Sequence, residues 1–268
     1  PELLISVQAL LNGSSDVAFG NVVGSNIANI FLVLGLASII CPIHMSKKLV
    51  KFDMLFLVMA TFLLMLFIAD NTLKIYEAGF FVLTLIIYTY LTFKMSPTSS
   101  QHDTVEDLSL EAEEQIATNP NMFVSIIMLL AGVGALASGA HFLVLGASEV
   151  ARIYDLSEAT IAVTIVAIGG SAPEIVTSVI SAIRKHSDLA IGNVVGSNIF
   201  NILGVLGIGG LIQPFKVSTT LVLFDIWVVF IATLLLFMIS VFKKSLSRLK
   251  GALFLVFYAL YIIWQIVV

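Results

Sequence analysis

One stretch of this sequence occurs twice, 172 residues apart. The first copy reads GNVVGSNIANI over residues 20–30, and the second reads GNVVGSNIFNI over residues 192–202. The same offset relates Pro1-Glu2 to Pro173-Glu174. A match of this length at a single offset indicates a duplicated structural unit. Each unit places one acid and several small polar residues within otherwise apolar sequence.

The composition predicts an all-α polytopic membrane protein. Hydrophobic residues make up 59% of the chain and charged residues only 11%, whereas a soluble domain carries roughly 25% charged residues. The net charge is −4, and no basic patch points to a nucleic-acid partner. Cys41 is the single cysteine, which rules out an internal disulfide and argues against a zinc cluster.

Long apolar segments give the order of the predicted helices. A spanning helix needs about 20 mostly apolar residues. After the tail of a broken helix at residues 1–11, such segments predict eight spans at residues 18–42, 52–70, 74–94, 122–151, 157–183, 188–212, 217–241 and 249–268. Comparison of the two copies predicts that roughly fifty residues, forming the first one and a half of ten helices, are missing before Pro1.

The distribution of Lys and Arg predicts the topology. If the loop at residues 43–51 is cytoplasmic, ten of the thirteen Lys and Arg residues lie inside, in agreement with the positive-inside rule. Five crossings then separate Glu2 from Glu174, so the two copies have opposite orientations, as in many secondary transporters. We predict a first inverted repeat at residues 1–95, an acidic cytoplasmic linker at 96–121 and a second inverted repeat at 122–268.

Two acids, Glu2 and Glu174, fall inside predicted spans that contain no Lys or Arg. A carboxylate inside a bilayer is costly, so the missing counter-charge is expected to be a proton or a bound metal cation. Hydroxyl and amide side chains in the repeats share helix faces at three- or four-residue spacing: Ser171 with Glu174, Ser25 with Asn29, and Ser197 with Asn201. Such oxygen donors suit Na⁺ and Ca²⁺.

The sequence around the second acid also predicts a broken helix. Pro173 interrupts the backbone hydrogen bonds just before Glu174, and Gly169-Gly170 loosen the same turn. The carbonyl groups of residues 167–170 therefore become candidate ligands, which a bilayer tolerates only where they line a cavity.

Further glycines and asparagines of the repeat predict packing beside the site. Two GxxxG pairs, Gly20 with Gly24 and Gly192 with Gly196, are typical of helices that approach closely. Asn26 and Asn198 are expected to bond across helices.

With these residues identified, the chain resembles the cation/Ca²⁺ antiporter superfamily, most closely its prokaryotic Na⁺/Ca²⁺ exchanger-like proteins. The resemblance is carried by AIGGSAPE at residues 167–174 followed by GNVVGSNIFN at 192–201, and by the partner motifs at 1–2 and 20–29. It implies the ten-helix exchanger fold, antiport of Na⁺ and Ca²⁺ by alternating access rather than enzyme activity, no cofactor, and a prokaryotic cell (inner) membrane as the location.

The resemblance also implies roles for individual residues. In the superfamily, two glutamates coordinate Ca²⁺ at the centre of the membrane, and these correspond to Glu2 and Glu174. The groups that correspond to its Na⁺ ligands are the hydroxyls of Ser25, Ser171 and Ser197, the side chains of Asn29 and Asn201, and the carbonyls of Ala167 and Gly170. The family usually has Thr at the position of Gly170. Many members have Asp at the position of Asn29 or Asn201, so the site here is less negative.

Other functions fit parts of this pattern. A Ca²⁺/H⁺ exchanger would use the same glutamates as proton carriers, although the H⁺-coupled branch typically has a Glu within the glycine–asparagine motif, where Ser25 and Ser197 stand here. A cation channel is disfavoured by the inverted broken helices, and an intramembrane protease by the lack of paired catalytic groups. The expected partners are Ca²⁺, Na⁺ or alternatively H⁺, and the lipid bilayer, with no obligate protein partner.

Overall fold

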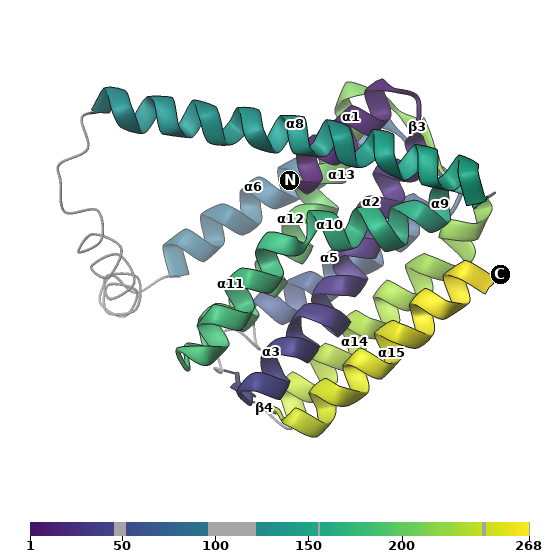
Figure 1. Ribbon diagram of the computed structural model, residues 1–268. Helices are drawn as coiled ribbons and strands as arrows, with labels where there is room; N and C mark the ends of the chain where they lie inside the picture. Colours follow the sequence, from purple (N-terminus) through teal and green to yellow (C-terminus); the bar gives the residue numbers. More distant parts are fainter. Residues whose placement is uncertain (46–51, 96–121, 155, 243–244, 268) are drawn as a thin grey trace.

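A computed structural model describes residues 1–45, 52–95, 122–154, 156–242 and 245–267. In chain order its helices, with η marking π-helical turns, are α1 (Glu2–Leu11), α2 (Ser15–Ala28), η1 (Asn29–Val33), α3 (Leu34–Ile40), α5 (Asp53–Phe67), α6 (Ile75–Met95), α8 (Met122–Tyr154), α9 (Glu158–Ile161), η2 (Ala162–Val166), α10 (Ala167–Gly170), α11 (Ala172–Ile183), α12 (Ser187–Phe200), η3 (Asn201–Val205), α13 (Leu206–Ile212), η4 (Leu221–Asp225), α14 (Ile226–Phe242) and α15 (Arg248–Val267). The four strands are β1 (Ile43–His44), β2 (Thr72–Leu73), β3 (Phe215–Lys216) and β4 (Ser245–Leu246). This architecture confirms the predicted all-α fold (Figure 1).

Several of these helices are suited to a bilayer. Within the described part of the chain, five continuous helices are long and apolar enough to cross a membrane, and the bent pair α9–α11 would make a sixth. The five are Ser15–Ile40, Ile75–Met95, Ser187–Ile212, Leu221–Phe242 and Arg248–Val267, and each coincides with a predicted span. The span predicted at residues 122–151 coincides with α8, a single helix of 33 residues.

The span predicted at residues 52–70 is shorter than expected. α5 has 15 residues, fewer than the roughly 20 needed to cross a bilayer perpendicularly. The chain leaves the helix after Ile68 and turns through Asn71, whose φ is +62°. In the same turn, the N–H of Thr72 donates to Asp70 Oδ1 at 3.1 Å. The polar turn therefore ends the helix before the apolar sequence ends.

Corresponding elements of the two copies have the same boundaries. α2, η1 and α3 match α12, η3 and α13 residue for residue at the 172-residue offset. Each π-helical turn begins at the repeated asparagine, Asn29 in η1 and Asn201 in η3. A π-helical turn widens the helix by one residue and is frequent at functional sites.

The two copies are packed crosswise. α3 of the first copy contacts α15 of the second, and α13 of the second contacts α6 of the first. The short strands follow the same rule, because β1 pairs with β4 and β2 with β3, both antiparallel. Such reciprocal contacts are what an approximate twofold relation between two copies produces. The repeat boundaries and the opposite orientation in the membrane stay predictions, and the linker at 96–121 lies outside the described residues.

Close helix crossings depend on glycine. A Cβ at Gly251 of α15 would overlap Ser38 Oγ and lie 2.8 Å from the carbonyl oxygen of Gly35 in α3. In the equivalent crossing, a Cβ at Gly207 of α13 would lie 2.8 Å from Val82 Cγ2 and 3.2 Å from the carbonyl oxygen of Ala78 in α6. These positions accept no larger side chain without moving a neighbour.

α8 is attached to the rest of the molecule differently from the other long helices. It runs across α1 and α9 along one side of the bundle (Figure 1) and also contacts η2. Leu143 of α8 packs against a small apolar cluster of Ile5, Ile161 and Val166, which is separate from the main core. Through its described residues, α8 therefore rests on the elements that lead into the repeated motifs.

Candidate functional site

The repeated motifs of the two copies meet in the interior of the bundle. α1 contacts η3, and α11 contacts η1, so each acidic helix lies against the π-helical turn of the other copy. α10 and α11 meet at a bend of 47°, with Ser171 at the break and Pro173 in the first turn of α11. The predicted helix break before Glu174 is therefore confirmed.

The two glutamates lie near each other. Glu2 is 5% exposed, and a Cβ on Gly170, four residues before Glu174, would lie 3.5 Å from Glu2 Cγ. Glu2 Oε1 and Glu174 Oε2 are buried without a hydrogen-bond partner among the described residues.

Asn26 and Asn198 join the two copies. The side-chain amide of Asn26 donates to the backbone carbonyl oxygen of Asn198 at 3.3 Å, and the side-chain amide of Asn198 donates to the backbone carbonyl oxygen of Asn26 at 3.2 Å. Both residues are buried, with exposures of 1% and 0%. The predicted bonding of this pair across helices is confirmed, and the two bonds fix the register of α2 against α12.

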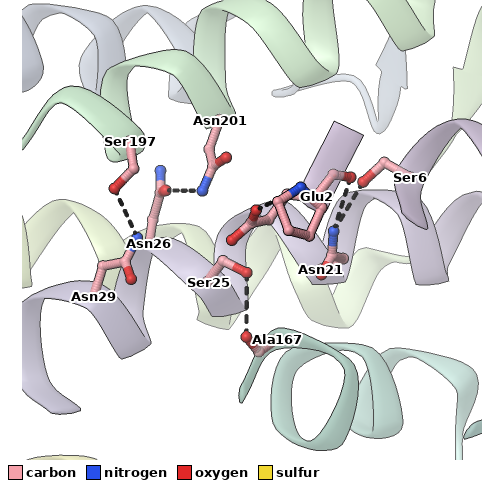
Figure 2. Close-up of polar contacts among 10 residues, drawn as sticks. Glu2, Ser6, Asn21, Ser25, Asn26, Asn29, Ala167, Ser197 and Asn201 are labelled. Atoms are coloured by element: carbon pink, nitrogen blue, oxygen red, sulfur yellow. Dashed lines mark hydrogen bonds and ion pairs between the residues drawn. The ribbon is translucent and has the colours of Figure 1, made fainter. Parts of the chain in front are cut away.

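The neighbouring asparagines are oriented by the same pair (Figure 2). Asn29 Nδ2 donates to Ser197 Oγ at 3.2 Å. The same nitrogen also donates to Asn198 Oδ1 at 2.9 Å. Asn201 Nδ2 donates to Asn26 Oδ1 at 3.2 Å. The two bonds that Asn29 Nδ2 donates fix the orientation of the Asn29 side-chain amide. Its side-chain oxygen Oδ1 is buried and has no hydrogen-bond partner among the described residues.

Ser25 connects the first copy to the broken helix of the second. Its hydroxyl donates to the carbonyl oxygen of Ala167 at 3.4 Å (Figure 2). The same carbonyl accepts the backbone N–H of Ser171 at 3.0 Å. Ser25, Ala167 and Ser171 are all fully buried, and Ser171 Oγ has no hydrogen-bond partner in the described part of the chain.

The structure adds Asn21 to the predicted set. A Cβ on Gly170 would lie 3.3 Å from Asn21 Oδ1 and 3.5 Å from Glu2 Cγ, so these three residues surround one point. Asn21 Nδ2 donates to Ser6 Oγ at 3.0 Å and to the carbonyl oxygen of Glu2 at 3.3 Å (Figure 2), whereas its Oδ1 has no partner within the described ranges. Asn21 is itself part of the repeated motif and lies one turn before Ser25, and this position is the signal in the sequence that could have identified it.

Five side chains at the site carry a buried oxygen without a hydrogen-bond partner among the described residues. An unpaired buried polar oxygen costs about 1–3 kcal/mol, a cost that an electropositive partner would offset. Among the described residues, the unpartnered oxygens at the site are Glu2 Oε1, Asn21 Oδ1, Asn29 Oδ1, Ser171 Oγ and Glu174 Oε2. Carboxylate, amide and hydroxyl oxygens are the ligands that hard cations prefer.

The predicted close packing at the glycine pairs is confirmed for the first copy. A Cβ at Gly20 would lie 2.6 Å from Ala162 Cβ, and one at Gly24 would lie 2.6 Å from Val163 Cα. α2 therefore lies directly against η2 and α10. For Gly196 in the second copy, no atom of the described residues lies within 4 Å of the Cβ position.

Together the fold and the site define a class of protein. An all-helical membrane protein with broken helices and a buried acidic site where two repeats meet has the architecture of ion-coupled transporters. It is a transporter rather than an enzyme.

Comparison with known proteins gives the family. Residues 1–94 and 124–267 match the family described as "Sodium/calcium exchanger protein", and the chain belongs to this family of cation antiporters. It is 34% identical to the uncharacterized membrane protein MJ0091 of Methanocaldococcus jannaschii, covering 98% of this chain and 80% of the relative. It is 27% identical to the sodium/calcium exchanger MaX1 of Methanosarcina acetivorans, covering 98% and 84%.

A solved structure supports the same assignment. The fold is similar to that of the sodium–calcium exchanger NCX_Mj, with a TM-score of 0.69 and 30% sequence identity, covering 98% of this chain and 81% of that one. The exchanger fold implied by the sequence motifs is therefore confirmed.

Proposed function

We propose that this protein exchanges Na⁺ for Ca²⁺ across a prokaryotic cell membrane, through the site between the two repeats. The observation that carries the proposal is that five side chains of the candidate site each have a buried oxygen without a hydrogen-bond partner among the described residues, two of them in Glu2 and Glu174. The charges of two carboxylates balance one Ca²⁺. Relatives named as sodium/calcium exchangers point in the same direction.

In this proposal, Na⁺ and Ca²⁺ compete for shared ligands. Ca²⁺ takes six to eight oxygens, so its binding uses both glutamates and neighbouring amide and carbonyl groups. Na⁺ ions occupy overlapping positions built from the serine hydroxyls, Asn29, Asn201, and the carbonyls of Ala167 and Gly170. Because the same oxygens cannot hold both ions at once, competition couples the two fluxes.

Alternating access would come from α8. Its contact with the rest of the chain includes the apolar cluster at Ile5 and Leu143, and apolar contacts can slide without breaking hydrogen bonds. The acidic linker at 96–121 is placed on the cytoplasmic side, and Ca²⁺ extrusion is the expected direction of transport.

The role of the glutamates can be tested with the complete protein, including the residues predicted before Pro1, in proteoliposomes loaded with Na⁺. Glu174→Gln removes one charge and keeps the size of the side chain, so Ca²⁺ uptake is expected to fall to background. Glu158→Gln, at the exposed start of α9, is the matched control and should transport normally. If Glu174→Gln transports like the wild type, the glutamate site is wrong.

A binding measurement separates loss of the site from loss of folding. Ca²⁺ binding stabilises the folded protein by mass action, so millimolar Ca²⁺ should raise the Tm of the wild type and of Glu158→Gln in detergent. Glu174→Gln should unfold cooperatively at a Tm that no longer responds to Ca²⁺. A Tm that still rises with Ca²⁺ would contradict the proposal even if the variant transports poorly.

A further inference from the structure

The first copy contains an aromatic cluster where α5 meets α6. The hydroxyl of Tyr88 in α6 donates to Asp53 Oδ1 at 2.9 Å. The ring of Phe52 stacks on Tyr88 with a centroid distance of 5.9 Å, and the ring of Phe56 packs against Tyr88 at 4.5 Å. Two rings of the chain itself therefore pack against Tyr88 in this cluster.

The second copy repeats most of this arrangement where η4 and α14 meet α15. The hydroxyl of Tyr261 donates to Asp225 Oδ1 at 2.8 Å. The ring of Phe224 stacks on Tyr261 at a centroid distance of 6.5 Å. Phe224 and Asp225 lie 172 residues after Phe52 and Asp53, and Tyr261 lies 173 residues after Tyr88, the offset that also relates the starts of α6 and α15, so the two clusters are structural equivalents.

The second cluster has further rings, since Tyr258 packs against Tyr261 at 6.4 Å and Trp264 stacks on Phe224 at 5.5 Å, but it has no ring at the position of Phe56. The residue 172 positions after Phe56 is Val228, whose short side chain cannot replace a phenyl ring. An open groove of about 360 Å³ lies at this place, bounded by Phe31, Phe224, Val228, Leu260, Tyr261 and Trp264. This volume is within the range of about 300–1,000 Å³ that small-molecule sites occupy.

The position of the groove determines what can fill it. α14 and α15 are both apolar enough to cross a membrane, and groove residues such as Leu260 and Trp264 are 56% and 49% exposed. An apolar cavity does not hold water, and a void towards the lipid would forfeit dispersion contacts. A second copy of the protein gains little here, because lipid tails are as apolar as its side chains. A flexible hydrocarbon chain fits a narrow groove of this kind.

We propose that an acyl chain of a membrane phospholipid binds in this groove, in the place that Phe56 occupies in the other copy. Trp264 and Tyr261 border the groove near the end of the last helix, and such aromatic side chains favour the level of the lipid headgroups. The bound chain also touches Phe31, which lies in η1 two residues after Asn29. The lipid therefore contacts the helical turn that carries a residue of the candidate ion site.

The two tryptophans of the chain provide an internal comparison. Trp264 borders the groove, whereas Trp227 lies outside it on α14, and their exposures are similar at 49% and 52%. General contact with lipid would thus affect both equally. The variants Trp227→Phe and Trp264→Phe each leave one fluorophore, which can be titrated with phosphatidylcholine that carries brominated acyl chains in liposomes of ordinary phosphatidylcholine.

We expect the fluorescence of Trp264 to be quenched in a saturable way at low mole fractions of brominated lipid, and that of Trp227 to fall in proportion to the mole fraction. Val228→Phe, added to the Trp227→Phe variant, places a ring in the groove where Phe56 lies in the first copy. The quenching of Trp264 should then rise in proportion to the mole fraction of brominated lipid, as it does for Trp227. Val241→Phe, at an exposed position of α14 outside the groove, is the matched control and should leave the saturable quenching intact.

Two results would overturn the proposal. Identical quenching curves for Trp264 and Trp227, unchanged by Val228→Phe, would mean that no acyl chain is retained. A change of oligomeric state on Val228→Phe, measured by light scattering and without selective quenching of Trp264, would assign the groove to a second copy of the protein. Neither result depends on which ions the protein exchanges.

Discussion

The close contact of α2 with the broken helix of the second copy allows the effect of Gly24→Ala on stability and transport to be predicted. The added Cβ would lie 2.6 Å from Val163 Cα, 2.8 Å from the carbonyl oxygen of Val163 and 2.8 Å from Ala167 Cβ. Two of these atoms belong to the backbone and cannot rotate away. Since carbon atoms pack at roughly 3.5–4.0 Å, the helices must separate by about 1 Å.

This separation should affect transport more than stability. Overpacking lowers the free energy of unfolding by about 1–3 kcal/mol, and the better helix propensity of alanine offsets up to about 1 kcal/mol of this loss. The Tm should fall by only a few degrees, at roughly 2–4 °C per kcal/mol. The hydrogen bond from Ser25 to Ala167, already 3.4 Å long, would be lost beside the site. Because binding groups displaced by 1 Å lose much of their effect, we expect Ca²⁺ uptake to fall at least about tenfold.

The assay is Ca²⁺ uptake into proteoliposomes, with the Tm measured in detergent on the same preparations. Gly79→Ala is the matched control, because its Cβ meets only Leu211 Cδ2 among the described residues, at an ordinary 3.9 Å. It should transport normally. If Gly24→Ala transports within twofold of the wild type at an unchanged Tm, the close contact between α2 and η2 is not required, and the reasoning is refuted.

Three further variants test other contacts. Asn26→Ala removes the bond that its amide donates to the Asn198 backbone and the bond that its Oδ1 accepts from Asn201, each worth about 1 kcal/mol, and should lower the Tm by several degrees; an unchanged Tm would show that the Asn26 side chain does not hold the copies together. Gly251→Ala should destabilise by about 1–3 kcal/mol through overpacking, and adding Ser38→Gly should recover part of the lost Tm; no recovery would contradict the assigned clash. Gly170→Ser fits with contacts of 3.3–3.5 Å and adds a hydroxyl, so half-maximal transport should need less Na⁺; an unchanged or higher requirement would place the hydroxyl away from the ions.

The sequence is informative where the signal is local. The duplicated motif alone aligns α2 with α12, and apolar runs locate most of the long helices. The break at Ser171 follows from Pro173, whose effect on the backbone is independent of its surroundings. The span of Glu174 contains no Lys or Arg. Because a carboxylate inside a bilayer is costly without a counter-charge, this absence predicts that a proton or a metal cation binds there.

Other features depend on tertiary contacts and leave no such signal. The crosswise packing of α3 on α15 depends on Gly251 and Ser38, which lie more than 200 residues apart. Two features do carry a local signal: α5 ends at the polar turn of residues 70–72, and Asn21 belongs to the repeated motif one turn before Ser25. Only the contact of Asn21 with Gly170 is tertiary.

The central claim is coupled exchange of Na⁺ and Ca²⁺, and the most direct test is to change the driving gradient. Ca²⁺ uptake should be followed in proteoliposomes with an outward Na⁺ gradient, with that gradient collapsed, and with a pH gradient in its place. The proposed function predicts uptake only with the Na⁺ gradient, and none in the Glu174→Gln variant. Uptake driven by the pH gradient alone would contradict Na⁺ coupling and indicate Ca²⁺/H⁺ exchange through the same fold.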